Sequence, residues 1–243
     1  DRYGVKIFKM GFCTENPGNP SGDILGNNEI IDYSSCTWSF ESTDGIDAEF
    51  SATSSIDLPE GSSAKPAAGT YPYAVMIMSK DIRIKGKYGP IAGTTYYSKD
   101  ANSLEDYAGT IEINEYAFST SPLVSFTGPN NCGSTIEGAA VTGGTMSGYL
   151  LDSTGKIIDS STTATQISNV NGNSINGGCE DPQKLLGVVT MTNDLTIDDN
   201  TNGLKMTFSV TNGMNATLDG NGGATDGQIE FITMAFGVTF ETF

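Results

Sequence analysis

Hydrophobic and polar residues alternate over the last part of the chain. The residues between the apolar positions are small or polar, and the apolar positions are Ile232, Met234, Phe236, Val238 and Phe240. A period of two residues is typical of a β-strand with one buried face. The pattern therefore predicts a strand over 228–242 with five apolar side chains on one face.

Similar short runs, alternating or rich in β-branched residues, recur along the whole chain between Gly, Asn, Asp and Pro. Helical periodicity is almost absent. The runs predict roughly twelve strands, over 3–12, 29–33, 36–40, 47–57, 72–88, 93–98, 109–118, 122–127, 147–159, 185–197, 203–211 and 228–242. We therefore expect an all-β fold, an antiparallel β-sandwich or jelly-roll-like arrangement with long polar loops.

The strand predicted over 72–88 has two different halves. From Ala74 to Met78 every residue is apolar, which is typical of a strand that is covered on both faces. Farther along, apolar and charged residues alternate, so one face of the second half carries three basic side chains: Arg83, Lys85 and Lys87.

Domain organisation is predicted from the loops. Residues 14–28 and 160–179 are long polar segments, and Asn-Gly and Asp-Gly pairs mark tight turns, most of them in the last third of the chain. We expect one β-rich domain over 1–243. The alternative is two packed β-sandwich halves, 1–128 and 129–243, each with one pair of cysteines.

Four cysteines lie far apart, without the close pairs that zinc and redox motifs require: Cys13, Cys36, Cys132 and Cys179. An even number of this kind favours two disulfides. Of the three connectivities, sequential pairing closes the shortest loops, and each bridge would contribute roughly 3–4 kcal/mol. The alternative is four buried thiols in a reducing compartment.

The first residue of the chain and its net charge indicate where the protein acts and which partners it can bind. The chain begins at Asp1 without methionine, which is expected of an exported protein whose leader has been removed. The net charge of −17 argues against nucleic acid as a partner. No apolar run approaches the roughly 18 residues of a membrane-spanning helix. We expect an extracellular or cell-surface protein without a transmembrane segment.

Catalysis has little support in the composition. The chain contains no histidine, which removes Ser-His-Asp and Cys-His nucleophiles and imidazole bases. The Ser-x-x-Lys spacing occurs at Ser62 and Ser153, but Pro66 follows the first copy and a turn predicted at 154–155 interrupts the second. We therefore expect that the protein is not an enzyme.

Calcium is the only cofactor that the sequence suggests. Asp198, Asn200 and Asn202, followed by glycine, match the opening of an EF-hand loop, in which side-chain oxygens converge on one cation. The twelfth position is Ser209 instead of glutamate, so the alternative is a polar hairpin turn. Asn215 opens the single Asn-x-Ser/Thr sequence and is a candidate for glycosylation.

Two functions of different classes fit these features. The first is a secreted structural subunit of an extracellular filament or surface assembly, joined to copies of itself by terminal β-strand addition. Its assembly residues would be the apolar series Ile232, Met234, Phe236, Val238 and Phe240, with Arg83, Lys85 and Lys87 meeting acidic neighbours. The alternative is an adhesin module that binds surface glycans through exposed aromatics, although Trp38, close to Cys36, is expected in the core.

Overall fold

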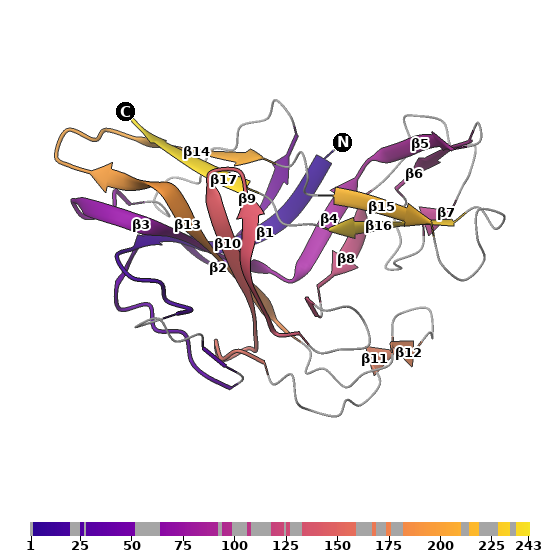
Figure 1. Cartoon of the computed structure of the whole chain (residues 1–243), viewed down its shortest axis with the longest axis horizontal. Helices are drawn as coiled ribbons and strands as arrows, with labels where there is room; N and C mark the ends of the chain where they lie inside the picture. The colour runs from indigo at the N-terminus through magenta and orange to yellow at the C-terminus, as the bar shows by residue number, and fades with distance from the viewer. Residues whose placement is uncertain are drawn as a thin grey trace.

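The computed structural model describes residues 2–19, 25–26, 28–51, 64–91, 94–98, 106–107, 118–123, 125–126, 133–158, 167–168, 174–175, 182–209, 214–218, 228–233 and 237–243. These residues form strands, turns and loops, with no helix among them (Figure 1). All the described strand pairs are antiparallel, which confirms the predicted all-β class.

The largest sheet contains eight strands in the order β8-β4-β1-β3-β13-β10-β9, with β2 on the other edge of β1. Their bounds are β1 Arg2–Cys13, β2 Cys36–Phe50, β3 Gly69–Ser79, β4 Asp81–Lys85, β8 Ser119–Pro122, β9 Thr135–Val141, β10 Gly144–Leu151 and β13 Lys184–Ile197. Because β3 and β4 both pair with β1 and are separated by one residue, they act as one long central strand. This sheet therefore contains strands from both parts of the chain, residues 1–128 and residues 129–243.

Smaller sheets surround the main one. They are formed by β14 (Leu204–Ser209) with β17 (Gly237–Thr242), β15 (Met214–Leu218) with β16 (Gln228–Thr233) and β7 (Asp106–Tyr107), β5 (Lys87–Ile91) with β6 (Thr94–Tyr97), and β11 (Ile167–Ser168) with β12 (Ser174–Ile175). Figure 1 shows β14 and β17 over the main sheet, and β15, β16 and β7 at the other end of the molecule. We call β14 and β17 the ribbon.

The predicted strands are confirmed best where hydrophobic patterning is strong. Those over 3–12, 185–197 and 203–211 correspond to β1, β13 and β14. The number of about twelve is wrong, because the described residues also form strands as short as the two-residue β7, β11 and β12. The segment 29–33 is not a strand: it has one isolated bridge, and it contributes the buried Ile31 from a loop that packs on the sheet.

The strand predicted over 228–242 is divided between two sheets. Its first part is β16, which pairs with β15 and β7, and its last part is β17, which pairs with β14. At the start of β17, a side chain on Gly237 would come within 2.6 Å of the Thr142 backbone. The close approach of the chain there requires glycine. Alternation predicted the strand character of both parts, but it carries no information about which partner each part pairs with.

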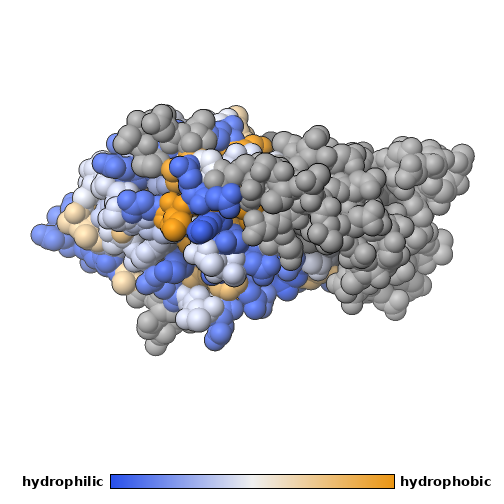
Figure 2. Space-filling model, turned by 90° about the horizontal axis from the view of Figure 1, so that it is seen from below, coloured by the Kyte–Doolittle hydropathy of each residue, from blue (hydrophilic) through white to orange (hydrophobic). Residues whose placement is uncertain are grey.

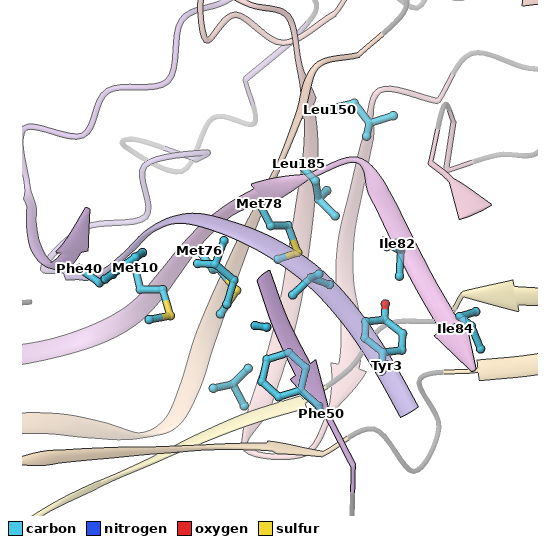
Figure 3. Close-up of a cluster of buried hydrophobic side chains, with 14 of the residues drawn as sticks. Tyr3, Met10, Phe40, Phe50, Met76, Met78, Ile82, Ile84, Leu150 and Leu185 are labelled. Carbon is cyan, nitrogen blue, oxygen red and sulfur yellow. The ribbon is translucent and has the colours of Figure 1, made fainter. Parts of the chain in front are cut away.

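Within the central strand, the segment from Ala74 to Met78 of β3 is buried on both faces, as predicted from its continuous apolar run. Met76 and Met78 belong to a cluster on the face towards the ribbon, where Figure 3 shows them with Met10 and Phe50. Val75 and Ile77 belong to a cluster on the opposite face, which loop residues such as Ile31 cover. We call these the ribbon-side face and the loop-side face. A sheet buried on both faces needs cover from two further layers.

The predicted turn at 154–155 is confirmed. Leu151 and Ile157 form a bridge, and Asp152 Oδ1 accepts hydrogen bonds from the backbone N–H groups of Thr154 at 2.7 Å and Lys156 at 3.0 Å. Desolvation opposes ionisation of Asp152, but these bonds and one from the Thr154 hydroxyl outweigh it, so its pKa lies below the ordinary value. The carboxylate thus holds the turn after β10.

A disulfide joins Cys13 to Cys36, which lie opposite each other at the ends of β1 and β2. This confirms the first of the two predicted bridges. The predicted bridge between Cys132 and Cys179 lies outside the described residues.

We predict that Met76→Ala and Ile77→Ala each lower the free energy of unfolding by about 2–4 kcal/mol, because each removes a buried side chain from a different face of β3. Denaturant unfolding of the two variants measures both losses. A strand covered on one face would show a large loss for one variant and little for the other.

We predict that replacing Cys13 and Cys36 together by serine lowers the free energy of unfolding by roughly 3 kcal/mol. The bridge joins residues separated by 23 positions, so it restricts the loop between them in the unfolded chain. Denaturant unfolding checks this value. An unchanged midpoint and slope would contradict the stabilising role of the bridge.

Candidate functional site

An open apolar cavity of about 870 Å³ lies between the main sheet and the ribbon. We call it the groove. Its floor is formed by side chains of β1, β2 and β3 and its roof by the ribbon. Floor residues include Met10, Phe12, Ile46, Ala48, Phe50 and Met76, and roof residues include Leu204, Met206, Phe208, Val238 and Phe240.

The alternation of two strands builds the groove. In β2, Ala48 and Phe50 are buried, whereas Asp47 and Glu49 on the other face are exposed. In β14, Leu204, Met206 and Phe208 are half-buried and alternate with exposed Lys205 and Thr207. Because side chains of successive residues point to opposite faces, both strands turn their apolar series towards the groove.

Aromatic contacts hold the ribbon on the sheet. The Phe240 ring meets the Phe12 ring edge-on, with centroids 5.0 Å apart, and the Phe208 and Phe50 rings lie 4.1 Å apart. Val238 is buried among the core residues of the ribbon-side face. Two of the predicted assembly residues, Val238 and Phe240, thus contact their own subunit in the single chain.

The remaining predicted assembly residues of the series are placed differently. Ile232 belongs to β16, opposite Asn215 of β15, and the side chains of both lie outside the described residues. Met234 and Phe236 also lie outside them. The five positions therefore do not share one strand, although each stays a prediction for assembly.

The rim of the groove is polar and basic. Lys205 forms a salt bridge with Glu241 of β17, with Nζ and Oε2 3.1 Å apart, and Lys65 Nζ donates to the Asp199 carbonyl at 3.5 Å. The main-chain oxygen of Phe243 accepts hydrogen bonds from the N–H groups of Asn202 and Gly203. Phe243 is 71% exposed, which leaves an aromatic ring at the end of the groove.

The predicted calcium residues form the turn between β13 and β14. Asp198 Oδ1 accepts from the Asn200 N–H at 2.9 Å and from the Thr201 hydroxyl at 3.2 Å, while the Asn202 amide donates to the Asn200 carbonyl. The loop thus satisfies many of its own polar groups. In the part of the chain described, no group of three or more carboxylates or cysteines gathers at one point.

The predicted basic face has contacts within the subunit. Arg83 Nη2 lies 2.9 Å from Asp47 Oδ1 on β2, and its guanidinium lies over the Phe118 ring, as does the Lys85 ammonium. Arg83 crosses β1 at Gly4, where an added Cβ would lie 3.2–3.4 Å from the Arg83 side chain. The Arg83 charge therefore has an intramolecular partner, and Lys87 is exposed.

Aromatic side chains that could stack on a glycan are partly covered where the structure describes them. Trp38 is half-buried in the loop-side cluster, with the Tyr33 ring 5.3 Å away and the Lys9 ammonium 5.0 Å from its ring centroid. Tyr97 is buried, and the Tyr96 side chain lies outside the described residues. In Figure 2 the coloured part of the surface is mostly hydrophilic around a small hydrophobic group. Glycan binding stays a prediction.

Comparisons with protein families, curated proteins and solved structures found no match for this chain. Within the described ranges, no helix has the length and apolar character needed to cross a membrane. The groove was not predicted from sequence. Its signal is the alternation at 46–50 and 204–208, but nothing in either segment indicates that the two face each other across a cavity.

Calcium binding by the β13–β14 turn stays a prediction. Millimolar calcium would raise the melting temperature through binding to the folded state, and Asp198→Asn would abolish the rise by removing the charged ligand. Thermal unfolding with calcium and with EDTA measures both effects. Equal melting temperatures in the two conditions would contradict the prediction.

Proposed function

We propose that this protein is a structural subunit of an extracellular filament or surface assembly, and that a second copy of the chain covers the groove. The open apolar groove beside β14 is the observation that carries the proposal. When a contiguous apolar surface of this kind is open to solvent, it is more often an interaction site than an ordinary part of the protein surface.

Strand addition suits the geometry of the groove. Among the described strands, β14 pairs with β17 alone, and the groove lies between the ribbon and the floor that β1 and β2 provide. In β-strand addition, main-chain hydrogen bonds provide affinity, and pockets for alternate side chains provide specificity. An extended segment from a neighbour would enlarge the ribbon into a broader second layer. The assembled subunit would then approach the predicted antiparallel sandwich.

Charge favours a second copy of this chain as the occupant. Lys65 and Lys205 stand on the rim, although the chain has only 12 basic residues against 29 acidic ones. Copies with a net charge of −17 repel each other at long range, so an interface needs local attraction. Acidic groups of a neighbour placed beside the two lysines would provide it.

The disulfide supports the proposed location. Bridges such as Cys13–Cys36 persist in oxidising compartments and are rare in the cytosol. The bridge also fixes the ends of β1 and β2, two of the strands that form the floor of the groove. An extracellular assembly subunit would benefit from a floor that resists unfolding outside the cell.

We predict that Met206→Asp raises the critical concentration for assembly more than about tenfold, because a carboxylate buried under a neighbour costs several kcal/mol. Light scattering and negative-stain microscopy measure assembly, and circular dichroism checks folding. The milder Met206→Ser is measured in parallel, so that a result remains if the aspartate prevents folding. Thr145→Asp, an exposed position on β10, is the control for added charge.

Folded Met206→Asp that assembles like the native protein would contradict the proposed interface. A native protein that stays monomeric at high concentration and moderate salt would contradict the filament proposal itself. Mass spectrometry of that monomer would show whether a small apolar molecule occupies the groove instead.

A further inference from the structure

We infer that a strand of the second copy pairs with the outer edge of β14, the edge that faces away from β17. The inference rests on the proposed function and names the main-chain groups that would bind the neighbour. They belong to Leu204 and Met206, whose side chains also line the groove. The same two residues would thus offer hydrogen bonds to the incoming strand and apolar contacts to its side chains.

The pairing of β14 with β17 fixes the direction of these main-chain groups. Gly203 and Phe243 exchange two hydrogen bonds, with N to O distances of 2.9 and 3.2 Å. In an antiparallel ladder, pairs that exchange two bonds alternate with pairs that exchange none. The register continues through β14 without a shift. Lys205 therefore bonds to β17, whereas its two neighbours, Leu204 and Met206, direct their N–H and C=O groups to the outer edge.

The outer edge of β14 is available to a further strand. Within the part of the chain that is described, β17 is the only strand that pairs with β14. A strand edge presents a row of N–H and C=O groups on which a strand of another chain can form. Addition at this edge requires no existing strand to leave, so the subunit keeps the ladder between β14 and β17.

A strand added to β14 would cover the groove. Phe240 of β17 packs on Phe12 of β1, and Phe208 of β14 packs on Phe50 of β2. The step from β17 to β14 in the ribbon therefore runs in the same direction as the step from β1 to β2 in the main sheet. Among the described strands, β14 and β2 both lack a partner on that side. The added strand would lie over the outer part of β2, where the half-buried Ile46 lines the groove.

The two faces of β14 specify the chemistry of the incoming strand. Leu204 and Met206 face the groove, and the exposed Lys205 lies on the opposite face. Because paired strands share their faces, alternate apolar side chains of the neighbour would enter the groove, and acidic side chains between them would lie beside Lys205. A second copy of this chain fits that requirement, because it carries 29 acidic residues against 12 basic ones.

The test is amide hydrogen exchange of the native protein, in the monomer and in the assembled material, read residue by residue by NMR after the exchange is quenched. The N–H groups of Leu204 and Met206 should exchange rapidly in the monomer and more than about tenfold more slowly in the assembly. Those of Lys205 and Thr207 are the internal control. They bond to β17, so they should be protected in both states.

Two variants at one position test the same edge independently. Met206→Pro removes the N–H group that points outward and no hydrogen bond to β17. Proline is tolerated on an edge strand at such a position, so the variant should fold and fail to assemble. The matched control, Met206→Ala, loses the side chain but keeps the N–H group, so it should still assemble, at a higher protein concentration. Circular dichroism checks the folding of both.

Assembly without added protection of Leu204 and Met206 would overturn pairing at this edge while the filament proposal stands. Folded Met206→Pro that assembles as readily as Met206→Ala would do the same. Protection of both N–H groups already in the monomer would also overturn the inference, because the edge would then be occupied within the subunit. Absence of assembly at any concentration would overturn the filament proposal and the inference together. If Met206→Pro does not fold, the exchange measurement decides.

Discussion

The need to cover both faces of the central strand governs this structure. From Ala74 to Met78 every side chain is buried, so apolar groups point to each side of the main sheet. Exposing either side to water would cost roughly 25 cal/mol for each Å² of apolar surface. The loop with Ile31 and the half-buried Trp38 cover one side, and the ribbon covers the other. The positions of the ribbon and of the loop with Ile31 follow from this requirement.

The two covers differ in a way that matters for function. On the loop-side face the Cys13–Cys36 bridge ties the covering segment to the sheet, because the loop that it closes includes Ile31 and Tyr33. On the ribbon-side face the described cover is two strands, held by side-chain packing and adjoining a cavity of about 870 Å³. The covalently fixed side suits a rigid body, whereas the open ribbon side suits a contact with a second copy of the chain.

Two of the salt bridges lie in different parts of the structure, one within the main sheet and one within the ribbon. Arg83 uses its guanidinium within the subunit, where it reaches Asp47 across β1. Lys205 also pairs within the subunit, with Glu241 of β17, at the rim of the groove. A surface salt bridge of this kind adds little stability by itself. Its larger effect is on the alignment of β14 with β17.

By itself the sequence determined the all-β class, the strand character of 3–12 and 185–197, the two-sided burial at 74–78, and the turn at 154–155. These features depend on residue periodicity and turn chemistry, which are local. The pairing of Cys13 with Cys36 was also predicted, from the short loop that it closes. Only the tertiary structure decided that 228–242 is divided between β16 and β17, that Arg83 reaches Asp47, and that the groove lies beside β14. Each of these depends on which distant segments become neighbours, and alternation within a strand selects a face without selecting a partner.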